Sequence, residues 1–215
     1  MSQTLSQSIA ETLREAIQHG MYICGDRLVE LTLSQELTVS QNTIRDALHI
    51  LEQEGWVHKI ARRGVYIPKF TVTEAEEIYA IWQALESLAL GWALETLSDI
   101  DRQHLREILI SAEHKVHRHE WVHASYMIHN LHTAIVSHAN APRTQMILGR
   151  VHNQAQLLEI QRQRFIPLNE DEWDNRIETH FEFLHEIDQH NTEKAISYLK
   201  RAIQYEEELV IPFLD

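Results

Sequence analysis

The sequence contains a single cysteine, only six glycines and four prolines among its 215 residues, and no long apolar run. Cys24 alone can form neither an internal disulfide nor a thiolate metal site. A membrane-spanning helix needs about 20 consecutive apolar residues, and a secretory signal needs a basic segment followed by an apolar one; the chain shows neither pattern. With 44% hydrophobic and 24% charged residues, the composition is that of a folded protein. We expect a cytoplasmic protein that does not act at a membrane.

The net charge of −13 is distributed unevenly along the chain. Residues 1–69 carry seven basic and eight acidic side chains, so nearly all of the excess negative charge lies in the residues that follow. Because charge balance influences the choice of partner, the two parts of the chain are expected to bind different partners. The overall acidity therefore does not exclude DNA binding by the first part.

Apolar residues at helical spacing predict three helices in the first part of the chain. The first helix carries a stripe of residues four apart, Leu5, Ile9, Leu13 and Ile17. A short helix follows with Leu33 and Leu37 inward, and a third begins after Ser40, a residue type that favours the N-cap position. The third helix buries the stripe Ile44, Ala47, Leu48 and Leu51. Two helices joined by a tight turn make a helix-turn-helix, predicted at about residues 30–49.

A change from helical to alternating periodicity predicts a β-hairpin after Gly55. Two short runs rich in β-branched and aromatic residues, Trp56–Ile60 and Val65–Ile67, flank a turn with two arginines. A basic wing after a helix-turn-helix is typical of DNA-binding domains, and we place this domain at residues 1–70, with the wing at 56–67. The candidate DNA-binding residues lie on the third helix and at the wing tip: Ser40, Gln41, Asn42, Thr43, Arg45, His49, Arg62, Arg63 and Gly64.

The chemistry of these side chains suits DNA. Asn and Gln can bond adenine bidentately, and Arg can bond guanine in the same way. Arginines at a hairpin tip suit the phosphate backbone or the minor groove. For any single residue the alternative is an exposed polar side chain that is only solvated. The combination of helix-turn-helix, polar recognition helix and basic wing, in that order, favours DNA binding.

Residues 71–215 are predicted to form an antiparallel, all-helical bundle of about six helices. Thr73 and Glu76 have the spacing of a capping box at its start. Further caps or breakers are expected at Ser98, at residues 140–142 and at Pro167. The first helix of the bundle is expected to bury one apolar stripe, Ile78, Ile81, Leu85, Leu88 and Trp92. The predicted fold is thus mostly α: a winged helix-turn-helix followed by a helical bundle.

The motifs of the first domain resemble those of the GntR family of transcription regulators, and within it the FadR-like branch. The corresponding stretches are CGDRL (24–28), VSQNTIRDAL (39–48), LEQEGWV (51–57) and RRGVYI (62–67). The second domain is similar to the all-helical, FCD-type effector domain of that branch in ALESLAL (84–90), LHTAIVSHAN (131–140) and THFEFLHEI (179–187). The resemblance implies a homodimer, a double-stranded DNA operator with two-fold symmetry, and a small-molecule effector, either an organic acid or an acyl-type metabolite.

Two DNA-contacting arginines of the family are replaced in this chain. Gln41 stands where the recognition helix usually has its first arginine, and Leu31 stands where the second helix usually has one, whereas Arg45 is retained. Gln cannot reproduce a bidentate arginine–guanine pair. We therefore expect an operator that differs from the family consensus.

The resemblance also implies a divalent metal site in the helical domain, whose four ligand positions fall on Ile128, His132, His180 and Ala202. Only the two histidines are ligand types, and a stable Zn²⁺ site normally has three or four protein ligands. Two interpretations remain. The histidines belong to the core or to a metal-free effector pocket at these four positions, or His129 or Glu206 rebuilds the site. No cofactor is assigned from the sequence.

The sequence thus predicts a DNA-binding transcription regulator, expected to be a repressor, whose helical domain senses a small metabolite. One alternative is the same fold without effector sensing, acting as a constitutive DNA-binding or protein-interaction module. A remote alternative is a histidine-dependent helical enzyme, but no nucleophile–base pair, phosphate-binding loop or complete ligand set supports it.

Overall fold

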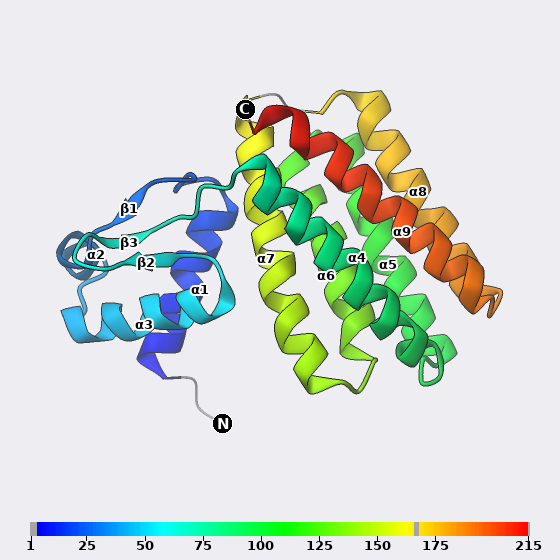
Figure 1. Cartoon of the computed structure of the whole chain (residues 1–215), viewed down its shortest axis with the longest axis horizontal. Coiled ribbons are helices and arrows are strands. Elements are labelled where there is room, and N and C mark those ends of the chain that lie inside the picture. Colours follow the sequence, from blue (N-terminus) through cyan, green and yellow to red (C-terminus); the bar gives the residue numbers. More distant parts are fainter. Residues whose placement is uncertain (1–3, 166–167, 215) are drawn as a thin grey trace. The chain divides into compact units, whose positions relative to one another are not determined.

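The computed structural model describes residues 4–165 and 168–214, and the chain divides into two compact units, Met1–Phe70 and Thr71–Asp215 (Figure 1). The predicted breaker Pro167 lies outside the described residues. Within the described ranges, no helix has both the length and the apolar character needed to cross a membrane.

The first unit combines three helices with a small antiparallel sheet (Figure 1). The helices are α1 (Leu5–Gln18), α2 (Glu30–Glu36) and α3 (Gln41–Glu54), and the strands are β1 (Arg27–Leu28), β2 (His58–Ile60) and β3 (Gly64–Tyr66). The strand order is β1-β3-β2, so the predicted hairpin gains a third strand. The sequence pattern missed β1 because a strand of two residues is too short to show an alternation.

Helix α3 begins and ends at the residues that its sequence predicts. The hydroxyl of Ser40 accepts a hydrogen bond from the Thr43 amide at 3.1 Å, which caps the first turn. Gly55 ends the helix at φ 86°, a left-handed conformation that favours glycine. The buried stripe of α3, Ile44, Ala47, Leu48 and Leu51, packs against α1. The α1 stripe is buried at Ile9, Leu13 and Ile17, whereas Leu5, its first residue, is exposed.

Within the described residues, the second unit consists of six α-helices and a short C-terminal 3-10 turn. The α-helices are α4 (Val72–Leu94), α5 (Asp99–His117), α6 (Trp121–Ser137), α7 (Pro142–Phe165), α8 (Glu170–Asp188) and α9 (Thr192–Val210). Helices α5, α6 and α7 pack in sequence, α8 packs on α9, and α4 contacts α6, α7 and α9 (Figure 1). Because connections of a few residues join α5 to α6, α6 to α7 and α8 to α9, these neighbours run in opposite directions.

Two predictions about α4 are wrong. The capping box is formed by Thr71 and Glu74 rather than by Thr73 and Glu76, and the helix begins two residues earlier than expected. Both pairs have the same spacing, so the pattern could not distinguish them. The buried face also differs: Ile78 is buried as predicted, but Ile81, Leu88 and Trp92 are exposed. The helix buries in addition Ala75, Tyr79, Trp82, Glu86, Ala89, Leu90 and Ala93. Apolar residues occur almost all round α4, so periodicity did not select one face.

Candidate DNA-binding surface and effector cavity

The outer face of α3 presents the polar residues that the sequence singles out. Gln41, Asn42, Arg45 and His49 are exposed, and Thr43 is half-buried. Ser40 and Thr43 have hydroxyls 2.9 Å apart, and Ser40 also caps the helix, so these two side chains fix the start of α3. Because α3 buries its opposite face, this surface of amide and guanidinium groups is free to enter a major groove.

Arg45 is oriented by a carboxylate of the preceding helix. Its Nε donates to the Glu30 carboxylate at 2.6 Å, while more than half of the Arg45 side chain remains accessible. Glu30 lies at the first residue of α2, where the helix dipole favours a negative charge. The pairing engages Nε, and one terminal nitrogen donates to the Asn42 side-chain oxygen at 3.5 Å, so the other terminal nitrogen is the donor most available for a guanine edge. Leu31, which stands where the family usually has an arginine, follows Glu30 in α2 and is exposed.

The wing places Arg62 and Arg63 in the turn between β2 and β3, where both side chains are exposed. Arg62 has a positive φ of 64°, a conformation that is unfavourable for a non-glycine residue. Gly64 has φ 119°, a backbone conformation that favours glycine; a Cβ there would lie 3.0 Å from the Arg27 Nε, so the Arg27 side chain would also have to shift. The turn therefore carries two cations on a backbone with little freedom to change.

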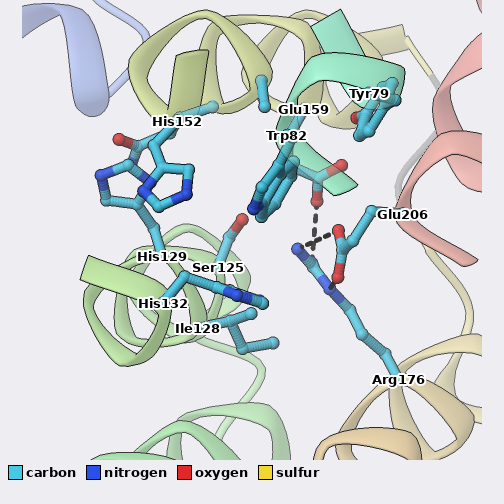
Figure 2. Close-up of a pocket in the computed structure, with 12 residues that line it drawn as sticks. Tyr79, Trp82, Ser125, Ile128, His129, His132, His152, Glu159, Arg176 and Glu206 are labelled. Atoms are coloured by element: carbon cyan, nitrogen blue, oxygen red, sulfur yellow. Dashed lines mark hydrogen bonds and ion pairs between the residues drawn. The ribbon is translucent and has the colours of Figure 1, made fainter. Parts of the chain in front are cut away.

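A cavity of about 20 Å³ lies inside the helical bundle (Figure 2). This volume accommodates a single water molecule and is far below the ~300 Å³ of a small ligand pocket. The walls come from α4, α6, α7, α8 and α9. The lining residues are Tyr79, Trp82, Ser125, Ile128, His129, His132, His152, Ala155, Gln156, Glu159, Arg176 and Glu206.

Glu86 of α4 binds the histidines on one side of this cavity. Its carboxylate accepts from His132 Nδ1 at 2.7 Å, from His152 Nε2 at 2.8 Å and from the Trp82 indole. Burial on its own would raise the pKa of Glu86, but the charges and hydrogen bonds of His132 and His152 outweigh it and hold the pKa well below its usual range. Glu86 is therefore an ionised carboxylate in the core.

Hydrogen-bond roles assign the proton of His180. The Nδ1 of His180 lies 2.7 Å from the Arg176 carbonyl oxygen, so it must donate. Burial, followed by the nearby charge of His132, lowers the pKa of His180 to about 3, which leaves its Nε2 as an acceptor. The two Nε2 atoms lie 3.2 Å apart, so a chain of hydrogen-bonding groups runs from Glu86 through His132 to His180.

On the opposite side of the cavity, Arg176 of α8 lies between two carboxylates (Figure 2). Its Nε and one terminal nitrogen bind Glu206 bidentately, both at 2.6 Å, and its other terminal nitrogen reaches Glu159 at 3.0 Å. Glu159 is also bound by Arg162 through two hydrogen bonds of 2.9 Å. All four side chains are at most 5% exposed. Two cations and two anions thus balance in the core.

The two glutamates differ in how firmly they hold their charge. Burial would raise the pKa of Glu159, but Arg176 and Arg162 together lower it to about 2. Burial raises the pKa of Glu206, and the neighbouring Glu159 charge adds to the effect, although Arg176 opposes it. Of the two carboxylates on Arg176, Glu206 is therefore the less stabilised anion.

The structure brings together some of the residues predicted for the effector pocket. His132 and Ile128 line the cavity, and so does His129. His180 contacts His132 but does not line the cavity. Ala202 is fully buried and does not line the cavity either. Glu206, proposed as a replacement ligand, lines the cavity but is engaged by Arg176.

The donor set does not fit a divalent metal ion. Among residues 4–165 and 168–214, no three His, Cys, Asp or Glu side chains are arranged to hold one. His132 and His180 supply two imidazoles, His152 Nε2 is bound to Glu86, and His129 lines the cavity without completing a set of three, whereas a stable Zn²⁺ site uses three or four protein ligands. The Nδ1 atoms of His132 and His180 are bound to Glu86 and to the Arg176 carbonyl, and their Nε2 atoms bind each other. No step of the function is therefore assigned to a metal.

The sequence pattern missed most of the charged cavity. Glu86 was overlooked because the predicted α4 stripe left it on the outer face, although it lies one turn after Trp82 on the buried face. Arg176 lies one turn before His180 on the same buried face of α8. This four-residue spacing from a predicted inward histidine could have indicated that Arg176 is buried. Glu159 and His152 lie on α7, for which no apolar stripe was predicted.

The chain matches two family models, "Bacterial regulatory proteins, gntR family" at residues 5–67 and "FCD domain" at residues 77–205. The HTH-type transcriptional regulator YdhC of Bacillus subtilis is 30% identical over 105 residues, which make up 49% of this chain and 47% of YdhC. The Exu regulon transcriptional regulator of Escherichia coli is 36% identical over 64 residues, 29% of this chain and 25% of that protein. The chain thus aligns with less than half the length of these relatives.

Solved structures show the same fold over nearly the whole chain. McbR/YncC of E. coli superposes with a TM-score of 0.84 over 94% of this chain and 95% of its own, at 19% identity, a likeness of fold alone. A protein described as a GntR transcriptional regulator from Rhodococcus sp. RHA1 gives a TM-score of 0.80 over 97% and 98%, at 25% identity. The matched family and the curated relatives are transcription regulators rather than enzymes. The chain belongs to the gntR family of bacterial regulatory proteins and joins a winged helix-turn-helix DNA-binding domain to an FCD domain.

Proposed function

We propose that this DNA-binding transcription regulator is a homodimeric repressor that recognises a two-fold symmetric operator and releases it in response to a small metabolite. The surface of α3 and the wing supports operator recognition, and the charged cavity of the bundle supports metabolite sensing. Repression requires only that an occupied operator overlap a promoter, so deletion of the gene is expected to raise transcription of the genes it controls.

The observation that carries operator recognition is the Arg45–Glu30 pair at the centre of the exposed α3 face. A side chain held in one orientation reads a base edge better than a freely rotating one. Gln41 and Asn42 lie one turn or less from Arg45 and supply amide groups for adenine, and the two wing arginines supply phosphate or minor-groove contacts.

The test is binding of the purified protein to the DNA upstream of its own gene at moderate salt. We expect the wild type to shift this fragment, and Arg45→Ala to weaken binding about 10- to 100-fold, since a bidentate base contact provides about 1–3 kcal/mol. Arg118→Ala removes an exposed arginine of the FCD domain and is the charge-matched control. Equal binding by Arg45→Ala and wild type at every genomic site would refute the proposal.

Dimerisation is supported by an exposed apolar surface on α4. Leu88 is 48% exposed and Trp92 39%, and Ile81 is 36% exposed about two turns further toward the N-terminus. The adjacent α7 exposes Met146 and Ile147 as well. Large apolar side chains on two neighbouring helices mark an interaction surface. A second copy of the chain is the proposed occupant, because a two-fold symmetric operator requires two reading domains.

Metabolite sensing is supported by the unfavourable free energy of burying the charged side chains that line the cavity. Burial of charged groups is unfavourable compared with apolar packing, so a core that only held the bundle together would gain from replacing them. The alternative, a constitutive DNA-binding or protein-interaction module, is favoured by one observation: the cavity, at about 20 Å³, has room for one water molecule but not for a metabolite. An effector must therefore displace a side chain, and the buried guanidinium favours an organic acid over an acyl chain.

A further inference from the structure

The lost metal site and the buried arginine lie in the same part of the bundle. Arg176 precedes His180 by four residues on α8, and Glu206 follows Ala202 by four residues on α9. Four residues are one helical turn, about 6 Å along the axis. The guanidinium therefore lies about one turn from the expected ligand positions and lines the same cavity as His132 and Ile128 (Figure 2).

We propose that the guanidinium of Arg176 replaces the metal ion as the fixed positive charge of the effector site, and that an anionic group of the effector binds it by exchanging with the carboxylate of Glu206. This inference rests on the proposed sensing function and names the residue that recognises the effector. A guanidinium is permanently charged and presents paired N–H donors that match a carboxylate, so it needs no metal to bind an anion.

Contacts distinguish Glu206 from Glu159 as the exchangeable carboxylate. Glu159 accepts hydrogen bonds from Arg162 and Gln163 in addition to Arg176, so its charge stays compensated when Arg176 turns to another anion. Within the part of the chain that the structure describes, Arg176 is the one cation bonded to Glu206. Displacing Glu206 therefore frees the paired donors of Arg176 without breaking the Arg162–Glu159 pair.

The exchange also explains how a cavity of this size admits a ligand. A volume of about 20 Å³ excludes any organic anion while Glu206 occupies its place on Arg176. Withdrawal of that carboxylate opens space for another of the same size. Because Arg176 belongs to α8 and Glu206 to α9, the exchange breaks a bidentate link between these two packed helices. An effector thus binds two arrangements of α8 and α9 unequally, as a regulatory ligand must.

Glu206→Ala tests the exchange directly, because it removes a CH2–COO⁻ group, which has the size of acetate. The thermal midpoint of the variant is measured in the presence of a chelator, with increasing sodium acetate against sodium chloride at equal ionic strength and against neutral acetamide. We expect acetate alone to raise the midpoint, and to do so saturably. Wild type and Glu208→Ala, which removes an exposed glutamate from the same helix, are expected to respond equally to acetate and chloride.

A folded Glu206→Ala protein without a specific acetate response overturns the proposal. If that variant does not fold, the metal content of the wild type decides: a metal-free protein whose thermal midpoint ignores both chelator and added Zn²⁺ supports the proposal, and a stoichiometric metal lost in His132→Ala overturns it. Operator binding is measured on the same samples. If wild type does not bind its upstream DNA, the regulator proposal fails, and this result is separate from the acetate and metal measurements.

Discussion

At the scale of single residues, the carboxylate of Glu30 decides what Arg45 can do. Replacement by glutamine, Glu30→Gln, keeps the size of the side chain and removes the charge that holds the Arg45 Nε at 2.6 Å. Arg45 then samples other rotamers, and the DNA face loses one negative charge. We expect non-specific DNA binding to strengthen and the ratio of specific to non-specific affinity to fall about 10-fold, within the discrimination that one bidentate contact provides.

Competition binding with operator and random DNA measures this ratio. Glu36→Gln removes the same charge from an exposed position on the same helix and serves as the control. It is expected to strengthen both affinities slightly and to leave their ratio unchanged. If the two variants behave alike, Glu30 acts only through its charge and does not orient Arg45.

Arg62 is held in a backbone conformation that costs about 1–2 kcal/mol for a residue other than glycine. Its replacement by glycine, Arg62→Gly, is therefore expected to leave the unfolding free energy of the DNA-binding domain unchanged or to raise it by about 1 kcal/mol. The same change removes a wing cation, so operator affinity is expected to fall and its salt dependence to become shallower by about one phosphate contact. Thermal unfolding and salt titration measure the two effects. A loss of both stability and affinity would show that the arginine supports the turn.

At the scale of elements, the sequence predicted where the helices lie but not always which face of a helix is buried. The recognition helix α3 was predicted well because its apolar residues form one narrow stripe between a Ser cap and a Gly stop. Helix α4 was not, because its apolar residues surround it, and burial then depends on which neighbours α6, α7 and α9 provide. The unexpected exposed stripe of α4 now supports a dimer interface.

Leu88→Glu tests that interface by placing a charge in the middle of the exposed α4 stripe. Because burial of an unpaired carboxylate is strongly unfavourable, we expect the dimer dissociation constant to rise at least 100-fold and operator binding to weaken with it. Sedimentation velocity measures the oligomeric state. The control, Ile100→Glu, changes a residue of α5 that is 79% exposed and is expected to leave the dimer intact. A Leu88→Glu protein that remains dimeric would place the interface on another surface.

At the scale of the whole molecule, the sequence predicted two domains more readily than the site inside the second. The candidate DNA-binding residues lie within about 25 positions of one another, so a local pattern is enough to propose them. The cavity is assembled from side chains of five helices, between Tyr79 and Glu206, and no local spacing connects them. Resemblance to the family indicated His132 and His180 as candidate residues. It could not indicate that Glu86 would bind His132 and His152, or that Arg176 would bind Glu159 and Glu206.

The buried histidine couples the stability of the FCD domain to pH. The pKa of His180 is about 3 in the folded protein against an ordinary value near 6.5. Below pH 6.5 the unfolded chain therefore takes up a proton that the folded one refuses. The stability due to neutral His180 is complete above pH 6.5 and declines by up to about 1.4 kcal/mol per pH unit as the pH falls toward 3.

Denaturant unfolding between pH 7 and pH 5 measures this decline, provided that it is compared between variants, since other groups also titrate. In His180→Gln we expect a lower free energy of unfolding at pH 7, because the hydrogen bonds to His132 and the Arg176 carbonyl are lost, and a dependence on pH that is shallower by nearly one proton. His114→Gln changes an exposed histidine and should keep the slope of the wild type. Identical slopes for all three proteins would mean that His180 is already protonated in the core, which would contradict the assignment of its Nε2 as an acceptor.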